Sequence, residues 1–326
     1  MRLLSALLIT TSLAAACTVP ARAGTVLDRI RATGTLRCGA DARPGLLDQA
    51  PNGQLRGMLL EICGAVASVI LPDKPNMHVT VYEADNSYDT VRKGEDDLVF
   101  LTGGEIREQD LAGVIIPGPT VFALSSNVMV PKASGIAHLS DLNGKSICFS
   151  MGSRAEPHLE AWAAAHHYDF RRGPFQEDSE LYDAYNSQYC TGLAAEITTL
   201  ASVRLDKGPK ELDSVILPEP LARYPLIAAT PTSDGQFASL VAWAVHTLMR
   251  AEVKGTDHSP RGLVSMQVPG APFGLRDNWQ QDMVAKSGTY ADMFRRNLGE
   301  DSPLRLARDA NALDEDGGML LQPYAE

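Results

Sequence analysis

The order of strand and helix patterns along the chain constrains its fold more than any other feature. Residues 35–40 and 78–83 have the pattern of short strands, and an apolar helix pattern, MLLEICGAVASVIL at 58–71, lies between them. A short helix pattern at 88–93 then leads to the strand pattern LVFL at 98–101. This order predicts an α/β fold with a parallel sheet, because parallel strands need crossover connections that are usually helices.

The same pattern begins again in the second half of the chain. An extended run at 122–131 precedes the strand pattern SICF, and a second extended run covers 215–230, where three prolines exclude a helix. Helix patterns follow SICF at 156–167, 179–189 and 194–205, and another covers 236–251. The chain therefore reads as two α/β units joined by two extended segments.

Two units joined in this way predict two lobes on a hinge, with a ligand cleft that closes on binding. We expect lobe 1 to comprise 24–126 with 219–326, and lobe 2 to comprise 127–218. The two hinge segments should lie near 123–130 and 215–224. The mature chain also has more residues than a single hydrophobic core usually supports, in agreement with two domains.

The first 23 residues have the features of a secretory signal peptide. Arg2 precedes an apolar stretch at 3–16, and Ala21-Arg22-Ala23 fits a cleavage site of small residues before Gly24. Lipid attachment at Cys17 is a less favoured alternative, because Ala14 is a weak residue three positions before it. No later stretch reaches the roughly 18 apolar residues that span a bilayer. We therefore expect an exported protein.

The charge balance excludes one class of partner. The whole chain carries a net charge of −11, and loss of the two signal arginines makes it −13. Nucleic-acid binding needs a basic face, so no nucleic-acid partner is expected. An anionic small ligand is still compatible, because the local charge of a cleft can oppose the overall sign. The sequence has no nucleotide-binding, zinc-protease or serine-hydrolase motif, so no cofactor is expected.

Four cysteines remain after the signal, namely Cys38, Cys63, Cys148 and Cys190. They form no CxxC pair and no histidine accompanies them at metal spacing, so no metal site is expected. An even number in an exported chain favours two disulfides, and three connectivities are open. Pairing Cys38 with Cys63 and Cys148 with Cys190 gives the shortest loops, each bond contributing about 3.5 to 4 kcal/mol in the loop-entropy model.

Several segments of the mature chain resemble one family. They are TLRCG, EICGAVASV, YDTVRKGEDD, LNGKSICFSMGS, VILPE and, most specifically, WQQDMVAKSGTYADMFRRNLG with a later NAL and GGM. These segments are similar to the type II periplasmic solute-binding proteins of polar and general L-amino-acid ABC transporters. The similarity covers essentially the whole mature chain, and all four cysteines fall where that group has cysteines. The resemblance thus implies the disulfides Cys38–Cys63 and Cys148–Cys190, one in each lobe.

The resemblance also implies how a ligand carboxylate is held. In this family an arginine shortly after a threonine at a strand end binds the α-carboxylate, and Thr102 and Arg107 match these positions. A guanidinium suits the role, because its paired N–H donors fit a carboxylate and its charge survives burial. The family's Ser-Gly-Thr-Thr turn reads Met151-Gly152-Ser153-Arg154 here, so Ser153 keeps a hydroxyl. Arg154 replaces the second threonine, and a solvent-facing position for it is an equally good interpretation.

Other positions depart from the family's pattern. Leu59 replaces the first acid of Gly-x-Asp-x-Asp, Leu46 replaces an aromatic residue, and Gly103 stands where a tryptophan is expected near the clamp. The aspartate that should hold the ligand ammonium aligns with Glu196, which is also suited to stabilise a helix N-terminus. Part of the amino-acid recognition set is therefore missing.

These candidates predict the charge of the ligand and the function. Arg107 and Arg154 oppose a single acid, Glu196, which favours an acidic amino acid or a dicarboxylate. We expect a monomeric periplasmic binding protein, not an enzyme, that captures an amino acid or small carboxylate and delivers it to an ABC permease in the inner membrane. One alternative is an accessory protein with a degenerate pocket. A less favoured one is an enzyme similar to cyclohexadienyl dehydratase, for which Glu196 is the only acid–base candidate.

Overall fold

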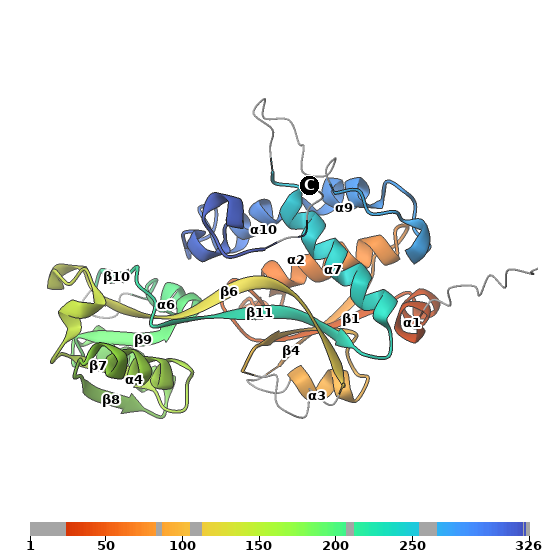
Figure 1. Ribbon diagram of the computed structural model, residues 1–326. Helices are drawn as coiled ribbons and strands as arrows, with labels where there is room; N and C mark the ends of the chain where they lie inside the picture. The colour runs from red at the N-terminus through yellow and green to blue at the C-terminus, as the bar shows by residue number, and fades with distance from the viewer. Residues whose placement is uncertain are drawn as a thin grey trace, which may run out of the picture.

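The computed structural model describes residues 24–82, 87–104, 113–206, 212–253, 266–321 and 323. The strands of its main sheet are β1 (Leu36–Asp41), β4 (Met77–Tyr82), β5 (Leu98–Thr102), β6 (Ile115–Pro131), β7 (Ser146–Ser150), β8 (Arg171–Phe175), β9 (Gly192–Glu196), β10 (Ser214–Ile216) and β11 (Ala222–Pro231). They are arranged in the order β4-β1-β5-β11-β6-β9-β7-β8, and β10 also pairs with β6 (Figure 1). Two short strands, β2 (Asp48–Gln49) and β3 (Leu55–Arg56), pair separately.

This sheet is parallel at its two ends and antiparallel in its middle. In lobe 1, β1 lies parallel between β4 and β5, and in lobe 2, β7 lies parallel between β8 and β9. The long strands β6 and β11 run antiparallel to each other and cross from one lobe to the other (Figure 1). β11 pairs with β5 on the lobe 1 side, and β6 pairs with β9 on the lobe 2 side. The predicted α/β fold with two lobes and two connecting segments is confirmed.

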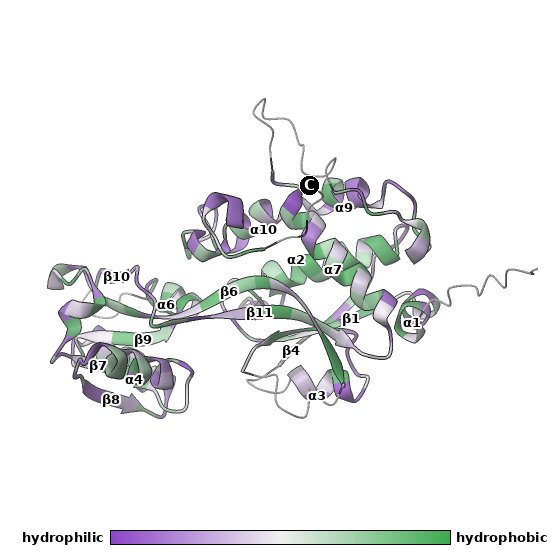
Figure 2. Cartoon of the chain, in the orientation of Figure 1, coloured by the Kyte–Doolittle hydropathy of each residue, from purple (hydrophilic) through white to green (hydrophobic). Residues whose placement is uncertain are grey.

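Lobe 1 contains the larger hydrophobic core. Its helices are α1 (Thr25–Thr33), α2 (Met58–Ile70), α3 (Ser87–Arg92), α7 (Gly235–Arg250), α9 (Trp279–Ser287) and α10 (Tyr290–Asn297). α2 packs against α1, α7, α9 and α10 as well as the sheet, which explains why the predicted helix is apolar nearly all round. Hydrophobic residues dominate both α2 and α7 (Figure 2). α2 ends before Pro72, as the sequence predicts.

Lobe 2 divides its apolar residues between two small clusters. Its helices are α4 (Ala155–His166), α5 (Asp178–Asn186) and α6 (Ile197–Val203). Ile147 and Phe149 of β7 contribute to the cluster that contains α4 residues, whereas the intervening Cys148 contributes to the cluster with residues of α5 and α6. Successive residues of a strand face opposite sides, so the two clusters lie on opposite faces of the lobe 2 sheet.

One predicted helix is partly wrong. The helix expected over 194–205 begins at Ile197, and residues 192–196 form β9 instead. Leu193 and Ala194 of this strand are fully buried in the two different clusters. Burial on both faces of the sheet outweighs the intrinsic helix preference of the alanines, as tertiary context commonly does. Glu196 is therefore the last residue of a strand rather than a residue within a helix.

Both predicted disulfides are confirmed. Cys38–Cys63 joins β1 to α2 in lobe 1, with 6.6 Å between the two Cα atoms. Cys148–Cys190 joins β7 to the residues just before β9 in lobe 2, with 5.8 Å between the Cα atoms.

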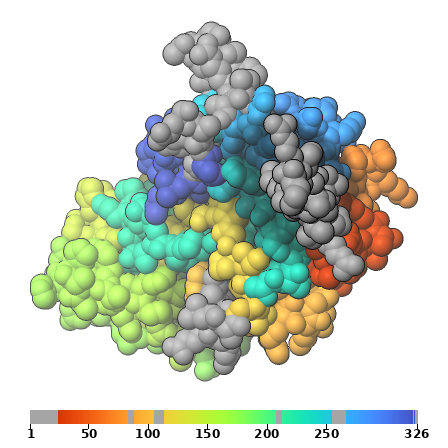
Figure 3. All heavy atoms as spheres, turned by 45° about the vertical axis from the view of Figure 1, so that its right-hand side comes forward, coloured from red at the N-terminus to blue at the C-terminus, as the bar shows by residue number. Residues whose placement is uncertain are grey.

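The C-terminal segment packs against a crossing strand, and Figure 3 shows it (dark blue) next to the strands that join the lobes (yellow and teal). The Asn311 side chain accepts a hydrogen bond from the Ala123 N–H at 2.7 Å and donates one to the Ala123 carbonyl at 3.1 Å. The predicted signal peptide at 1–23 lies outside the described residues. Within the described ranges, no helix has both the length and the apolar character needed to cross a membrane.

Candidate ligand-binding cleft

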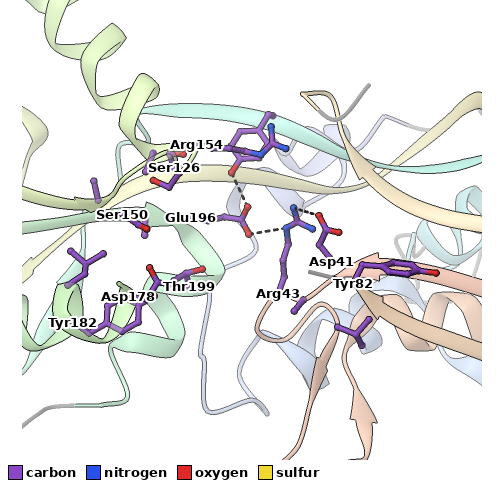
Figure 4. Close-up of a pocket in the computed structure, with 18 residues that line it drawn as sticks. Asp41, Arg43, Tyr82, Ser126, Ser150, Arg154, Asp178, Tyr182, Glu196 and Thr199 are labelled. Carbon is purple, nitrogen blue, oxygen red and sulfur yellow. Dashed lines mark hydrogen bonds and ion pairs between the residues drawn. The ribbon is translucent and has the colours of Figure 1, made fainter. Parts of the chain in front are cut away.

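A cavity of about 390 Å³ lies between the two lobes (Figure 4). Strand ends from both lobes form its walls: Asp41 and Tyr82 end β1 and β4 of lobe 1, and Ser150 and Glu196 end β7 and β9 of lobe 2. Further polar residues that line it are Arg43, Ser126, Ser153, Arg154, Asp178, Tyr182, Thr199 and Tyr224. The carboxyl ends of parallel strands are the common place for ligands in α/β proteins, so this cavity is the candidate site.

Glu196 lies on the lobe 2 wall at the junction of β9 and α6. Its Oε1 accepts a hydrogen bond from the Thr198 hydroxyl at 3.1 Å, and its Oε2 accepts one from the Tyr224 hydroxyl at 3.0 Å. The carboxylate is directed into the cavity (Figure 4). Its assignment as the partner of a ligand ammonium stays a prediction.

Arg43 reaches the same carboxylate from the opposite wall. Its Nε lies 3.4 Å from Glu196 Oε1, and its Nη2 lies 3.7 Å from Asp41 Oδ2 (Figure 4). The Arg43 side chain is 10% exposed, Asp41 5% and Glu196 17%, so the three charges are largely shielded from water. Sequence reasoning did not select Asp41 or Arg43 as site residues. The available signal was their place just after a strand of a predicted parallel sheet.

Tyr224 of the crossing strand β11 and His158 of α4 in lobe 2 extend this polar network. Burial, together with the negative charge of Glu196, raises the pKa of the Tyr224 phenol, so the hydroxyl stays protonated and donates. The His158 ring lies 5.4 Å from the Tyr224 ring, and its Nδ1 is 2.8 Å from the Ser126 hydroxyl. Burial, with a smaller effect of the Arg154 charge, lowers the pKa of His158. The imidazole is therefore neutral at pH 7, and the fixed cations of the wall are arginines.

Ser153 and Arg154 precede α4, at the edge of the cavity. The Ser153 hydroxyl is buried and has no hydrogen-bond partner among the described residues. The Arg154 guanidinium lies 6.0 Å above the Tyr224 ring, and Gly104 of lobe 1 is so close that a Cβ there would meet it. Arg154 thus lines the cleft, and its contact with a ligand stays a prediction. A hydroxyl, a guanidinium and a helix N-terminus together suit an anionic group.

The other predicted clamp residues are Thr102 and Arg107, and the structure describes only the first of them. Thr102 ends β5 and is fully buried, and it is not among the described residues that line the cavity. Arg107 lies outside the described residues, so its role stays a prediction. The described turn at Gly104, next to Arg154, leads into the segment that contains Arg107.

Three departures from the family pattern also have structural outcomes. Leu46 and Leu59 are buried in the lobe 1 core and are not part of the described cavity wall. Glu61 accepts a hydrogen bond from the Asn297 side chain at 2.7 Å and pairs with Arg296, so it holds the end of α10 on α2. A Cβ on Gly103 would meet no atom of the described residues within 4 Å, and the resemblance expects a tryptophan at this position.

The predicted charge balance of the cleft requires a correction. The described charged residues of the wall are two cations, Arg43 and Arg154, and three acids, Asp41, Asp178 and Glu196. The prediction counted Arg107, which lies outside the described residues, and Arg154 against Glu196, and it omitted one cation, Arg43, and two acids, Asp41 and Asp178. The balance no longer favours an extra negative charge on the ligand, and it agrees equally well with a zwitterion. Across the described residues, no group of three or more potential ligands is placed to hold a metal ion.

Comparison with known proteins agrees with this two-lobed binding architecture. No protein-family model matches the chain. A general L-amino acid-binding periplasmic protein of Rhizobium johnstonii is 27% identical over 320 residues, covering 93% of each chain. A glutamate/glutamine/aspartate/asparagine-binding protein of Rhodobacter capsulatus is 26% identical over 326 residues, covering 95% of this chain and 96% of that protein.

The solved structures include a periplasmic binding protein of an ABC transporter from Brucella ovis with glutathione bound. Its TM-score is 0.74 at 25% identity, with 91% of this chain and 98% of that chain covered. The fold and the inter-lobe cavity match the two-lobed architecture of that periplasmic binding protein. This chain is related over nearly its whole length to the periplasmic binding components of amino-acid ABC transporters.

Proposed function

We propose that this chain is the periplasmic substrate-binding component of an ABC transporter. It captures an amino acid or a related small carboxylate between its lobes and delivers it to a permease of the inner membrane. Residues 24–126 with 219–326 form lobe 1, residues 127–218 form lobe 2, and residues 1–23 direct export and are removed. The protein acts as a monomer.

The observation that carries this proposal is the composition of the cleft. Both lobes place charged groups at the ends of parallel strands around one cavity of about 390 Å³, within the range of about 300 to 1,000 Å³ for small-molecule sites. Ser153 and Arg154 offer donors to a carboxylate, and Glu196 offers an acceptor. Arg107 would supply the second guanidinium on closure, as the resemblance implies.

Transport is favoured over the two alternatives. The relatives are named as binding proteins, and a polar cavity lined from both lobes does not support a degenerate pocket. An enzyme would need an acid or base free to exchange protons with a substrate. Glu196 is held instead by Tyr224, Thr198 and Arg43, an arrangement suited to binding.

Calorimetric titration with acidic, neutral and basic amino acids, dicarboxylates and small peptides such as glutathione tests the function. We expect at least one to bind wild type, and Arg107→Ala and Arg154→Ala to lose about 2 to 5 kcal/mol of binding free energy, the usual cost of removing one partner of a desolvated charge pair. Arg172→Ala is the matched control, because this arginine of lobe 2 is 53% exposed and pairs with Glu156 and Glu160 outside the cavity.

Small-angle scattering adds a second measurement, because closure about the hinge should reduce the radius of gyration at saturation. Absence of binding across the whole panel would support the accessory-protein alternative. Equal affinity of wild type and both cleft variants would remove the carboxylate clamp from the proposal.

A further inference from the structure

The carboxylate of Glu196 already has a cationic partner that the protein itself supplies. A carboxylate has about four acceptor positions, and three donors approach this one: Thr198, Tyr224 and Arg43. Two of these donors are neutral hydroxyls of the lobe 2 wall and of β11. The third is a guanidinium that comes from lobe 1, across the cleft (Figure 4).

Arg43 is fixed in this position rather than loosely placed. Its side chain is only 10% exposed, and Asp41, at the end of β1, lies on its other side. The backbone around Arg43 is also ordered, since its N–H donates to the Leu47 carbonyl at 2.8 Å and its carbonyl accepts from the Leu46 and Leu47 N–H groups at 3.0 Å. The guanidinium thus occupies the lobe 1 side of the Glu196 carboxylate, the group that the resemblance assigns to a ligand ammonium.

We propose that Arg43 is a specificity-determining residue that occupies the ammonium position of Glu196, so that the cleft prefers carboxylates whose α-nitrogen is an uncharged amide. Peptides and N-acylated amino acids belong to this class. A free α-ammonium at Glu196 would lie beside the Arg43 guanidinium in a site of low dielectric constant, where like charges repel strongly. An amide N–H can donate to the same carboxylate without that repulsion. The inference rests on the proposed capture of a small carboxylate.

The rest of the cleft agrees with such a ligand. Ser153 and Arg154 remain for the carboxylate end. Three donors leave about one of the four acceptor positions of Glu196 open, so a neutral N–H donor can still bind there. Asp178 is exposed and lies on the rim of the cavity near Tyr182. Burial, with a smaller effect of the Asp178 charge, raises the pKa of Tyr182 to about 12. The cavity of about 390 Å³ also leaves room for an acyl group beyond a single amino acid.

Matched ligand pairs test the inference. Wild type and Arg43→Met are titrated with each free amino acid of a panel and with its N-acetyl form. For the N-acetyl amino acid that wild type binds most tightly, we expect an affinity at least about tenfold higher than for the same amino acid in its free form. Arg43→Met should shift this ratio by about tenfold or more toward the free amino acid, because the ammonium then meets Glu196 without a competing cation. Arg43→Gln, which keeps a polar side chain, should shift the ratio in the same direction.

Two control variants separate charge from structure. Tyr224→Phe removes a neutral donor from the same carboxylate, and it should change the ratio by less than about threefold. Arg37→Met removes a partly buried arginine that pairs with Asp97 outside the cavity, and it should leave the ratio unchanged.

The outcomes distinguish this inference from the proposed function. A wild type that prefers free amino acids, or a ratio that Arg43→Met and Arg43→Gln leave unchanged, overturns the role of Arg43 while capture of a carboxylate stands. If no compound of either kind binds wild type or the variants, the proposed function and the inference fail together.

Discussion

The two lobes differ in how they bury apolar surface and in what they offer to a ligand. In lobe 1 one large cluster unites α2, α7, α9 and α10 with one face of the sheet, and a smaller cluster with α3 covers the other face. The cleft residues Asp41 and Arg43 of lobe 1 already pair with each other. In lobe 2 two small clusters lie on opposite faces of the sheet, and the Ser153 hydroxyl has no partner among the described residues. We infer that lobe 1 is the more stable support and that lobe 2 is prepared for a ligand through the Ser153 hydroxyl.

Removal of each disulfide should have the largest effect, because it should reveal the difference in stability between the two lobes. In the loop-entropy model, loops closed over 42 and 25 residues correspond to about 4 and about 3.5 kcal/mol. The values are similar, but lobe 2 has the smaller cores to offset the loss. We expect the Cys148→Ser/Cys190→Ser variant to unfold lobe 2 at a lower urea concentration than lobe 1, whereas Cys38→Ser/Cys63→Ser should lower the stability of lobe 1 and leave it folded.

Tryptophan fluorescence can follow each lobe separately. Trp162 lies on α4 in lobe 2, and Trp243 and Trp279 lie on α7 and α9 in lobe 1. A Trp162→Phe background therefore reports lobe 1 alone. Coincident unfolding of both lobes in both disulfide variants would show that the lobes unfold as one unit, and the contrast drawn from their cores would be wrong.

Each lobe has a histidine whose lowered pKa should make its stability depend on pH, and the dependence should differ between the lobes. His246 lies on α7, its Nδ1 has no hydrogen-bond partner among the described residues, and burial lowers its pKa to about 4. In the unfolded chain this pKa is about 6.5, so the unfolded state takes up the proton first. The stability that neutral His246 confers is complete above about pH 6.5 and is lost toward pH 4, by about 2 kcal/mol at pH 5.

Urea unfolding at pH 7.5 and pH 5 measures this loss. His246→Gln should remove most of it, because glutamine does not titrate. His158→Gln should remove less, because the pKa of His158 is lowered in the same direction by a smaller degree of burial and by Arg154. An equal pH dependence of wild type and His246→Gln would contradict the assignment.

Much of the fold was predictable from local patterns. α2 combines an apolar sequence with a proline just beyond its end, and β1, β4 and β5 lie between clear turn signals. β9 was not predictable, because its Ala194 and Ala195 favour a helix and only burial between two clusters makes them a strand. That burial depends on residues far away in the sequence.

The candidate site was predictable in part, for a similar reason. Ser153, Arg154 and Glu196 were selected through the resemblance, and all three line the cavity. Thr102 was selected in the same way, and it is buried at the end of β5 rather than placed in the described wall. Arg43 was missed, because its importance arises from Glu196, a partner 153 positions away on the other lobe. Pairing across a cleft leaves no local pattern in a single sequence.

The smallest predicted effect tests whether lobe 2 is prepared for a ligand. The Ser153 hydroxyl is buried at the cavity without a partner among the described residues, and a hydroxyl left in this way costs stability. Ser153→Ala should therefore leave the unfolding free energy unchanged or slightly higher, and it should weaken ligand binding by about 1 kcal/mol, the net value of one hydrogen bond. Ser187→Ala is the control, because this exposed serine after α5 bonds to the Ala184 carbonyl at 3.1 Å, away from the cavity. Calorimetric titration beside thermal unfolding measures both quantities. Unchanged affinity with raised stability would mean that the ligand never contacts Ser153, and the preparation of lobe 2 would then depend on Arg154 alone.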